Sequence, residues 1–420
     1  MGVDRVAGRR ARLPISMLTG IREPRFRVIG AIFVCSWAGN QFTPLLLMYE
    51  HRDHYSSVLA NALLGVYVLG LAPALLIAGP LSDRRGRRPV MLLGLICALT
   101  GSASLAAGPL GPGFVLCGRL LSGAAIGVAM AVGGGWLREL CEPSFSAAAR
   151  PSQAVRHAAL AFSCGAGLGA LASGLLAQWG PLPQTLPFLV NIAFTLPLFA
   201  LVARAPETVG HETHNHVWWR QLRVEAARHP RFLRVVLIAA PWIFLGAAVG
   251  YGYLPTRLSA DTGGLSLAYA SLSSALALGI AALIQPLANR LHSTTSGRGL
   301  ICAVMTISVG VAVAGMAIAN ASPLLGLVAN LLIGAGIGIG MISGGHEVQR
   351  VAGAHELAGL TGLFYATAYL GFFAPTIIAA LGAFASDQML LWLVAALGCL
   401  SAAAILPSFR SHLPPLPNAT

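Results

Sequence analysis

The stretch GPLSDRRGRRPV, residues 79–90, places five charges within six residues between two long apolar runs. Its single acid, Asp83, can accept hydrogen bonds from backbone N–H groups at a helix start. The arginines beside it can bridge carboxylates of another segment. Gly79 and Gly86 permit a tight turn and a close approach of two helices. This chemistry is suited to an electrostatic contact, although arginines in such a loop also serve simply to orient a membrane protein.

Arg119 is a second candidate because it is a lone charge inside an apolar run. A charge in hydrocarbon costs about 3 kcal/mol or more, and it usually faces a cavity or a partner. Arg119 could bind an anionic group of a substrate, with Asn40 and Gln41 as hydrogen-bonding neighbours. The competing interpretation is that it extends toward the lipid headgroups. No Asp or Glu falls in mid-membrane, so a group that could carry protons is not evident.

Aromatic residues inside the apolar runs could line a cavity for a bulky, partly apolar ligand. Tyr365 and Tyr369 are four residues apart and therefore share one helix face, although helix packing explains such a pair as well. The candidates for a substrate or proton pathway are Arg119, Asn40, Gln41, Tyr67, Trp242, Tyr251, Tyr365 and Tyr369.

The sequence predicts no metal site, no cofactor and no catalytic residues. The three histidines of HETHNH (211–216) are close enough to share a metal, but no fourth ligand is evident. The seven cysteines are scattered and form no CxxC pair, so we interpret them as small buried hydrophobic residues.

The composition assigns the chain to the integral membrane proteins. Of its 420 residues, 56% are hydrophobic and only 10% are charged, whereas a soluble protein carries roughly 25% charged residues. All 27 basic residues are arginine, and the formal net charge is +13. Such an excess could attract nucleic acid, but the positions of the arginines explain it without that partner.

Twelve apolar runs are long enough to cross a membrane as helices. They are residues 28–49, 57–80, 89–108, 113–136, 156–179, 184–203, 232–254, 266–288, 299–319, 324–345, 357–381 and 388–407. We therefore predict an all-α integral membrane protein of two six-helix bundles. Its predicted parts are a basic tail (1–27), a first bundle (28–203), a linker (204–231), a second bundle (232–407) and a second tail (408–420).

The arginines predict the orientation. With the N-terminus inside, 24 of the 27 arginines fall in interior segments and two in exterior loops. Positive residues are retained on the cytoplasmic side. We therefore expect a multi-pass protein of the cytoplasmic membrane with both termini cytoplasmic. Membrane lipids are its expected surroundings, and we expect a monomer.

The two halves are related in sequence. RLLSGAAIGVAMAVGG (119–134) and NLLIGAGIGIGMISGG (330–345) agree at nine of sixteen positions with a shift of 211, and GPLSDR (79–84) matches QPLANR (285–290) with a shift of 206. Two related halves around a mid-membrane site are common in secondary transporters. The small residues expected at close helix contacts are Gly123, Gly127, Gly165, Gly169, Gly174, Gly334 and Gly338.

The charged stretch strongly resembles the loop signature of the major facilitator superfamily, Gly-x-Leu-x-Asp-Arg-x-Gly-Arg-Arg. PET at 206–208 resembles a second hallmark, and Arg119 with Gly123 resembles the Arg-x-x-x-Gly pattern of proton-coupled members. The resemblance implies alternating access, a role for Arg119 in tuning a proton site, and an interior latch between the signature and the other half. The residues on the signature pattern are Gly79, Leu81, Asp83, Arg84, Gly86, Arg87 and Arg88.

Within this superfamily the chain resembles the drug:proton antiporter group. Residues 165–174 approach the Gly-x-x-x-Gly-Pro pattern of export members, although Ala170 stands where proline is expected. Our first expectation is proton-coupled efflux of a drug-like compound or metabolite. Uptake of a small organic solute by proton symport or uniport is the alternative. A polytopic membrane enzyme acting on lipid-linked substrates is the alternative from another class.

Overall fold

The computed structural model describes residues 23–52, 54–142, 145, 151–209, 224–291, 293, 295–353 and 356–411, and the chain folds into helices. Within this described part, 12 helical stretches are long and apolar enough to cross a membrane. They follow the predicted spans in order and approximate position, which confirms the all-helical architecture.

The first half contains α2 (Pro24–Asn40), η1 (Thr43–Leu45), α3 (Leu46–His51), α4 (Ser57–Arg85), α5 (Arg87–Ala106), η2 (Gly108–Leu110), α6 (Pro112–Leu140), α7 (Pro151–Trp179) and α8 (Leu186–Ala203). The second half begins with η4 (Glu225–Arg228), η5 (Phe232–Val236), α9 (Leu237–Ala247), η6 (Ala248–Tyr253), α10 (Leu254–Arg257) and η7 (Ser259–Thr262). It continues with α11 (Ser266–Leu283), α12 (Gln285–Leu291), α13 (Arg298–Ala319), α14 (Pro323–Val351), α15 (Leu357–Tyr369), η8 (Leu370–Phe373), α16 (Ala374–Leu381), α17 (Asp387–Ile405) and η9 (Leu406–Ser408).

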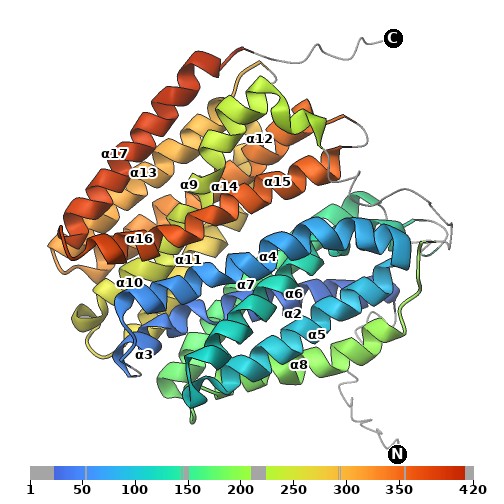
Figure 1. Cartoon of the computed structure of the whole chain (residues 1–420), viewed down its shortest axis with the longest axis horizontal. Coiled ribbons are helices and arrows are strands. Elements are labelled where there is room, and N and C mark those ends of the chain that lie inside the picture. Colours follow the sequence, from blue (N-terminus) through green and yellow to red (C-terminus); the bar gives the residue numbers. More distant parts are fainter. Residues whose placement is uncertain are drawn as a thin grey trace, which may run out of the picture.

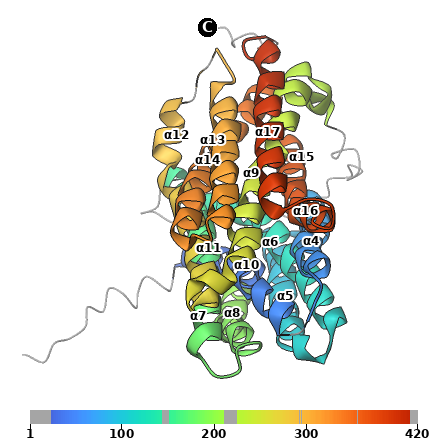
Figure 2. The same ribbon diagram turned by 90° about the vertical axis from the view of Figure 1, so that its left-hand side faces the viewer.

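Two helical bundles lie side by side, one formed by α2–α8 and the other by η5–α17 (Figures 1 and 2). The charged turn between α4 and α5 lies at one end of the first bundle. We call the end of the molecule that holds this turn the signature end, and the opposite end the far end. At the far end α3 and α10 come close together, at the lower left of Figure 1.

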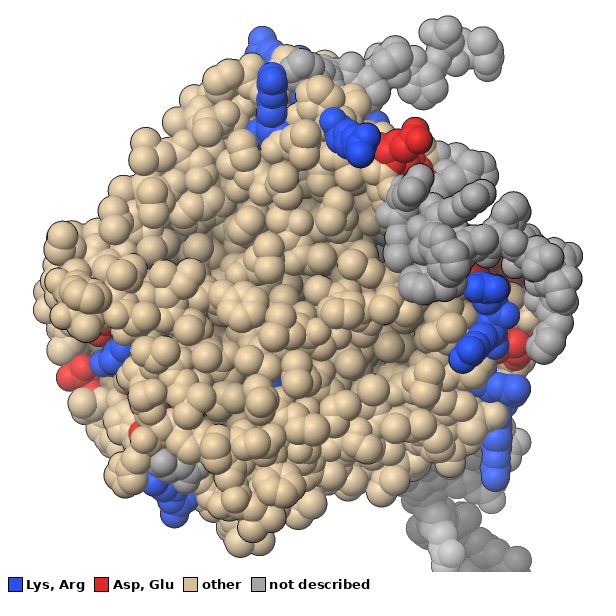
Figure 3. Space-filling model, in the orientation of Figure 1, with Lys and Arg blue, Asp and Glu red and all other residues tan. Residues whose placement is uncertain are grey.

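The charged side chains gather toward the two ends of the molecule and leave a broad uncharged band between them (Figure 3). Large apolar side chains such as Leu196, Ile377 and Leu400 are more than half exposed. Exposed apolar surface of this extent is stable in hydrocarbon rather than in water, so the band is the lipid-facing surface.

Three spans are interrupted helices. The first is broken between α2 and η1, and Pro44 lies within η1. The seventh contains two π-helical segments, η5 and η6, and the eleventh is interrupted by η8, which ends two residues before Pro375. Proline removes a helical hydrogen bond, and a π segment changes the helical register, so backbone groups become available for other partners. Both prolines can be recognised in the sequence as residues that disturb a helix, but nothing in the sequence pointed to the π segments.

All seven glycines predicted for helix packing lie where a Cβ would come within 3 Å of a neighbouring helix. Gly123 and Gly127 on α6 face backbone carbonyls of α4, and their repeat partners Gly334 and Gly338 on α14 face backbone carbonyls of α11. The same close contact is therefore built twice, once in each bundle, which is why the repeat conserves glycine there.

Candidate functional site

The turn between α4 and α5 is built around Gly86. Its φ of 97° lies in the left-handed region, where glycine is the least strained residue. The carboxylate of Glu207 accepts hydrogen bonds from the backbone N–H groups of Arg87 (2.8 Å) and Arg88 (3.0 Å). A Cβ at position 86 would lie 2.4 Å from Glu207 Oε2. The helix-capping role that the sequence suggested for Asp83 therefore belongs to Glu207, and the PET segment and the signature form one structural unit.

Arg87 connects this turn to α6. Its Nη2 lies 2.9 Å from Glu139 Oε1, and its Nη1 pairs with Asp83 one helical turn earlier. The hydroxyl of Thr208 donates to the other oxygen of Glu139. These partners lie in the first bundle and in the segment directly after it. A contact between the signature and the second bundle, as the latch requires, remains a prediction for another conformation.

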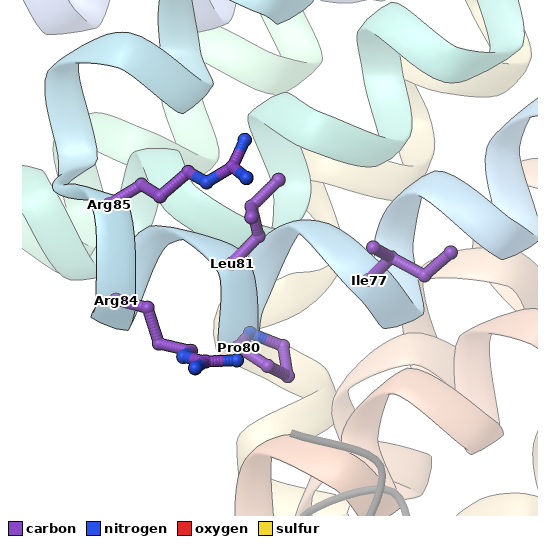
Figure 4. A pocket seen from close by; sticks show the side chains of 5 residues that line it. All are labelled: Ile77, Pro80, Leu81, Arg84 and Arg85. Atoms are coloured by element: carbon purple, nitrogen blue, oxygen red, sulfur yellow. The ribbon is translucent and has the colours of Figure 1, made fainter. Parts of the chain in front are cut away.

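Arg84 and Arg85 lie apart from this network. They line a cavity of about 440 Å³ together with Ile77, Pro80 and Leu81 (Figure 4). Leu76, on the same stretch of α4, packs beside Gly362 of α15, so this region of α4 borders the second bundle. The cavity is therefore a cationic opening at the signature end.

Arg119 is enclosed by backbone. Its side chain is buried, and its three guanidinium nitrogens each donate to a carbonyl oxygen at 3.0–3.2 Å. The acceptors are Leu63, Leu64 and Gly39. Gly39 lies next to the break between α2 and η1. Arg119 thus joins α6 to α4 and to the interrupted first span.

Two aromatic rings complete the enclosure of Arg119. The guanidinium carbon lies 4.6 Å from the ring centroid of Phe42 and 4.8 Å from that of Tyr67. Cation–π contacts of this kind stabilise a desolvated charge by about 2 kcal/mol. In this conformation Arg119 neither extends to the headgroups nor opens onto solvent.

The predicted polar neighbours of Arg119 form hydrogen bonds elsewhere. Gln41 Nε2 donates to Ser102 Oγ at 2.9 Å, and Ser102 donates in turn to Asn191 Oδ1 at 2.9 Å. Asn40 donates to a carbonyl of its own helix, four residues earlier. The expectation that both amides hydrogen-bond Arg119 does not match this structure, because the guanidinium nitrogens donate to the backbone carbonyls of Leu63, Leu64 and Gly39 instead.

Predicted aromatic residues meet between the bundles. The ring centroids of Tyr67 in the first bundle and Tyr369 in the second lie 6.0 Å apart in an edge-on arrangement. Phe244 stacks on Tyr369 at 4.0 Å, and Phe372 lies 5.9 Å from Tyr67. The Tyr369 hydroxyl lies 3.7 Å from the sulfur of Met130. We call these five residues the central cluster. Nothing in the sequence pointed to Phe244 or Phe372, because phenylalanine in an apolar span carries no polar signal.

The remaining predicted aromatics lie outside the central cluster. Trp242 packs beside Gly398 of α17 within the second bundle. Tyr365 neighbours Phe364, with ring centroids 5.3 Å apart, and it is only partly buried. Tyr251 lies in η6 and is 2% exposed.

Open space begins one helical turn beyond the central cluster, toward the signature end. Met130 and Gly134 are four residues apart on α6 and share a face. A Cβ on Gly134 would have nothing within 4 Å. A Cβ on Gly345 of α14 would likewise have nothing within 4 Å. Gly345 is the repeat partner of Gly134, and it follows Met341 as Gly134 follows Met130. The two bundles therefore present matching small residues to unfilled space on this side.

Polar contacts join the bundles at the far end. Gln178 Nε2 donates to the carbonyl of Gly264 at 3.1 Å, and its Oε1 accepts from the backbone N–H groups of Leu267 (3.1 Å) and Ala268 (3.3 Å) at the start of α11. Gly174, one turn earlier on α7, lies directly against Ser271. The predicted packing glycine Gly174 is thus part of the interface between the bundles.

A second charge cluster lies at the signature end of the second bundle. Arg231 and Glu347 are both buried and form a two-point ion pair, with N–O distances of 2.6 and 3.1 Å. Arg350 lies 2.7 Å from the same carboxylate. This ion pair was not predicted from the sequence. The sequence did contain a signal for Arg231, because the PRF at 24–26 recurs as PRF at 230–232. The shift between them is 206, the same as for the signature, so Arg231 occupies a repeated position.

The histidine cluster at 211–216 lies outside the described residues. Among the described residues, no group of three or more His, Cys, Asp or Glu side chains is placed to hold a metal ion.

Three solved structures with a similar fold are described as a peptide transporter, a nucleoside transporter and a sugar–proton symporter. A peptide transporter POT in complex with sulfate has a TM-score of 0.75 and 12% identity, covering 93% of this chain and 95% of that one. The nucleoside transporter NupG has a TM-score of 0.72 and 13% identity, with coverages of 92% and 99%. A D-xylose-proton symporter has a TM-score of 0.68 and 16% identity, with coverages of 95% and 98%. No curated protein matches the chain in sequence.

The family is shown by the match to a family model in sequence. Residues 28–376 match the family described as Major Facilitator Superfamily. This range includes the signature turn, Arg119 and the central cluster, and it covers most of the chain. The chain therefore belongs to the major facilitator superfamily, whose members are secondary transporters and not enzymes.

Proposed function

We propose that this protein moves a small organic solute across a cytoplasmic membrane by alternating access, with the coupling of solute uptake to protons as the main candidate. The observation that carries the proposal is the asymmetry between the two ends. The bundles are joined at the far end by Gln178 and at mid-depth by Tyr67 and Tyr369, while Gly134 and Gly345 face open space toward the signature end. This arrangement suits one half of a transport cycle, open to one side only.

The similar solved structures support uptake over efflux. They include a D-xylose-proton symporter, a peptide transporter and a nucleoside transporter. Efflux by a drug:proton antiporter is the second candidate, and it rests on the pattern of Arg119 and Gly123 and on the glycines of α7. The alternative of a membrane enzyme is wrong, because the superfamily consists of transporters.

We assign the signature end to the cytoplasm. The support is the excess of arginine in the segments at this end, including Arg84 and Arg85 beside the cavity. In the opposite conformation the signature would close against the second bundle and act as a latch. Asp83→Asn tests the latch: expression should stay intact while transport falls, and transport at the normal rate would leave the turn with only an orienting role.

The function is tested with purified protein in liposomes. A thermal-shift screen of sugars, dipeptides, nucleosides and drug-like cations first identifies a solute that stabilises the protein. Uptake of that solute, radiolabelled, is then measured under an inward and an outward proton gradient. Accumulation driven by protons moving with the solute supports symport, whereas accumulation driven by protons moving against it supports the antiporter. Absence of flux for every stabilising solute, under either gradient, contradicts the proposal.

A further inference from the structure

A second cavity lies at the far end, on the interface between the bundles. It measures about 450 Å³, within the range of small-molecule sites. The first bundle contributes the end of α3 and the region after α7, and the second bundle contributes η7 and the start of α11. His51 of one bundle and Ser259 of the other both line it, with ring nitrogen and hydroxyl 3.5 Å apart. We call it the far-end cavity.

The lining has an apolar floor and a polar rim. Leu47, Met48 and Ala177 are buried apolar side chains, and Leu267 adds a partly buried one. Arg52 is exposed at the rim. A ligand that fits this surface has an apolar body and a head that accepts hydrogen bonds from a guanidinium.

The charges near the far-end cavity favour an anionic head. Arg52 and His51 supply the donors of the first bundle. The start of α11 also lines the cavity through Ser266 and Leu267, but its first N–H groups donate to Gln178. The neighbouring acids Glu50 and Asp261 do not line the cavity, and one carboxylate oxygen of Glu50 is bonded to the hydroxyl of Ser57. Arg52 itself is bonded to no other described side chain, so its guanidinium is available for a carboxylate or phosphate.

We propose that the far-end cavity is a regulatory site for an amphiphilic anion, which binds only while the far ends are joined. Both bundles line the cavity, so separation of the far ends divides the site in two. A ligand that binds one conformation shifts the population toward it. Occupancy therefore stabilises the conformation closed at the far end and slows transport. The anion is either a soluble organic acid or the headgroup of an anionic lipid, since both combine the same chemistry.

The binding test uses the full chain in nanodiscs of neutral phosphatidylcholine, with 4-tert-butylbenzoate as the probe. Calorimetry should detect saturable binding of this acid, and binding of 4-tert-butylbenzylammonium at least about tenfold weaker, since one charge-assisted hydrogen bond is worth that factor. Arg52→Gln removes the charged donor, and Leu267→Trp fills the apolar floor of the cavity. Each variant should weaken binding of the acid about tenfold or more. Arg410→Gln, at an exposed arginine of the signature end, is the control and should leave binding unchanged.

A second variant tests the dependence on conformation. Gly174→Leu does not alter the lining, but its side chain would collide with Ser271 across the interface and separate the far ends. Binding of the probe should be lost while the variant still elutes as a folded monodisperse protein. Nanodiscs of phosphatidylglycerol identify the source of the natural anion. If this anionic lipid competes with the probe, the natural ligand is a lipid headgroup; if it does not compete, the natural ligand is a soluble acid.

Equal affinity for the acid and the ammonium, or wild-type affinity in Arg52→Gln and Leu267→Trp, overturns the site. Wild-type affinity in a folded Gly174→Leu protein overturns the link to conformation. The regulatory effect rests on the proposed transport function, but the binding measurements do not require transport. Failure to observe flux would therefore count against the proposed function alone, and failure to observe binding against the site alone.

Discussion

The guanidinium of Arg119 donates a hydrogen bond to the carbonyl oxygen of Gly39, 3.2 Å away, where the first span is interrupted between α2 and η1. A buried cation thus stabilises a break in a neighbouring helix without any carboxylate among its hydrogen-bond partners. The interrupted helix leaves a carbonyl that needs a donor, and the arginine needs acceptors to remain in the membrane interior.

Arg119→Lys is the sharpest test of this arrangement. Lysine keeps the charge but cannot reach three carbonyls with a planar fork, so it should lower the free energy of unfolding by about 2 kcal/mol or more. Thermal unfolding of the purified variant measures this loss, with Arg410→Lys at an exposed position as the control. A variant as stable as the wild type would show that the three carbonyl contacts contribute little.

Glu207→Ala should weaken the signature turn. It removes a carboxylate that caps two backbone N–H groups at the start of α5, and the loss of a cap costs about 1–2 kcal/mol. Amide hydrogen exchange at the start of α5 should become faster in this variant. Glu142→Ala, at an exposed acid of the same end, should leave exchange unchanged. Equal protection in both variants would contradict the capping role of Glu207.

Gln178→Ala should open the far end. The substitution removes three hydrogen bonds between the bundles, which are together worth about 1–2 kcal/mol. A cysteine at Ser271, which is fully buried at this interface, reports the opening in a background without the native cysteines. A loss of about 1–2 kcal/mol raises the population with an open far end about tenfold. Maleimide labelling of this cysteine should therefore become about tenfold faster.

The matched control for Gln178 is Gln388→Ala, at the far-end start of α17. The Gln388 side chain makes no hydrogen bond with another described residue, so labelling should stay at the reference rate. If Gln178→Ala labels no faster than Gln388→Ala, the contacts of Gln178 do not hold the far ends together.

Glu347→Gln should be strongly destabilising. It leaves the buried Arg231 without its counter-charge, which typically costs about 3–5 kcal/mol. Replacing both partners by Met at 231 and Leu at 347 should recover part of the stability, because the fully buried charge of Arg231 is removed. Arg350 also loses its carboxylate partner, but it is partly exposed and keeps the carbonyl of Ser293 as an acceptor. Thermal unfolding of the single and double variants gives the coupling between the two sites. A double variant less stable than Glu347→Gln would mean that the charges themselves hold this end together.

Local features of the sequence were enough to predict the membrane class, the order of the spans and the position of the charged turn. The hydrocarbon interior requires each span to be apolar and to satisfy its own backbone hydrogen bonds, so this information is contained within each segment. The same holds for Gly123, Gly127 and their repeat partners, because a close helix contact depends on the absence of a side chain.

Only the tertiary structure decided which partners the polar and aromatic side chains select. Glu207, rather than Asp83, caps α5 because the chain after α8 returns to the signature turn. Arg119 contacts carbonyls that lie 55 to 80 residues away in sequence. Tyr67 contacts Tyr369 only because the first and second bundles pack against each other at this point. Such choices depend on long-range geometry, where residues that are apolar or neutral in sequence, such as Phe244, become as important as the charged ones.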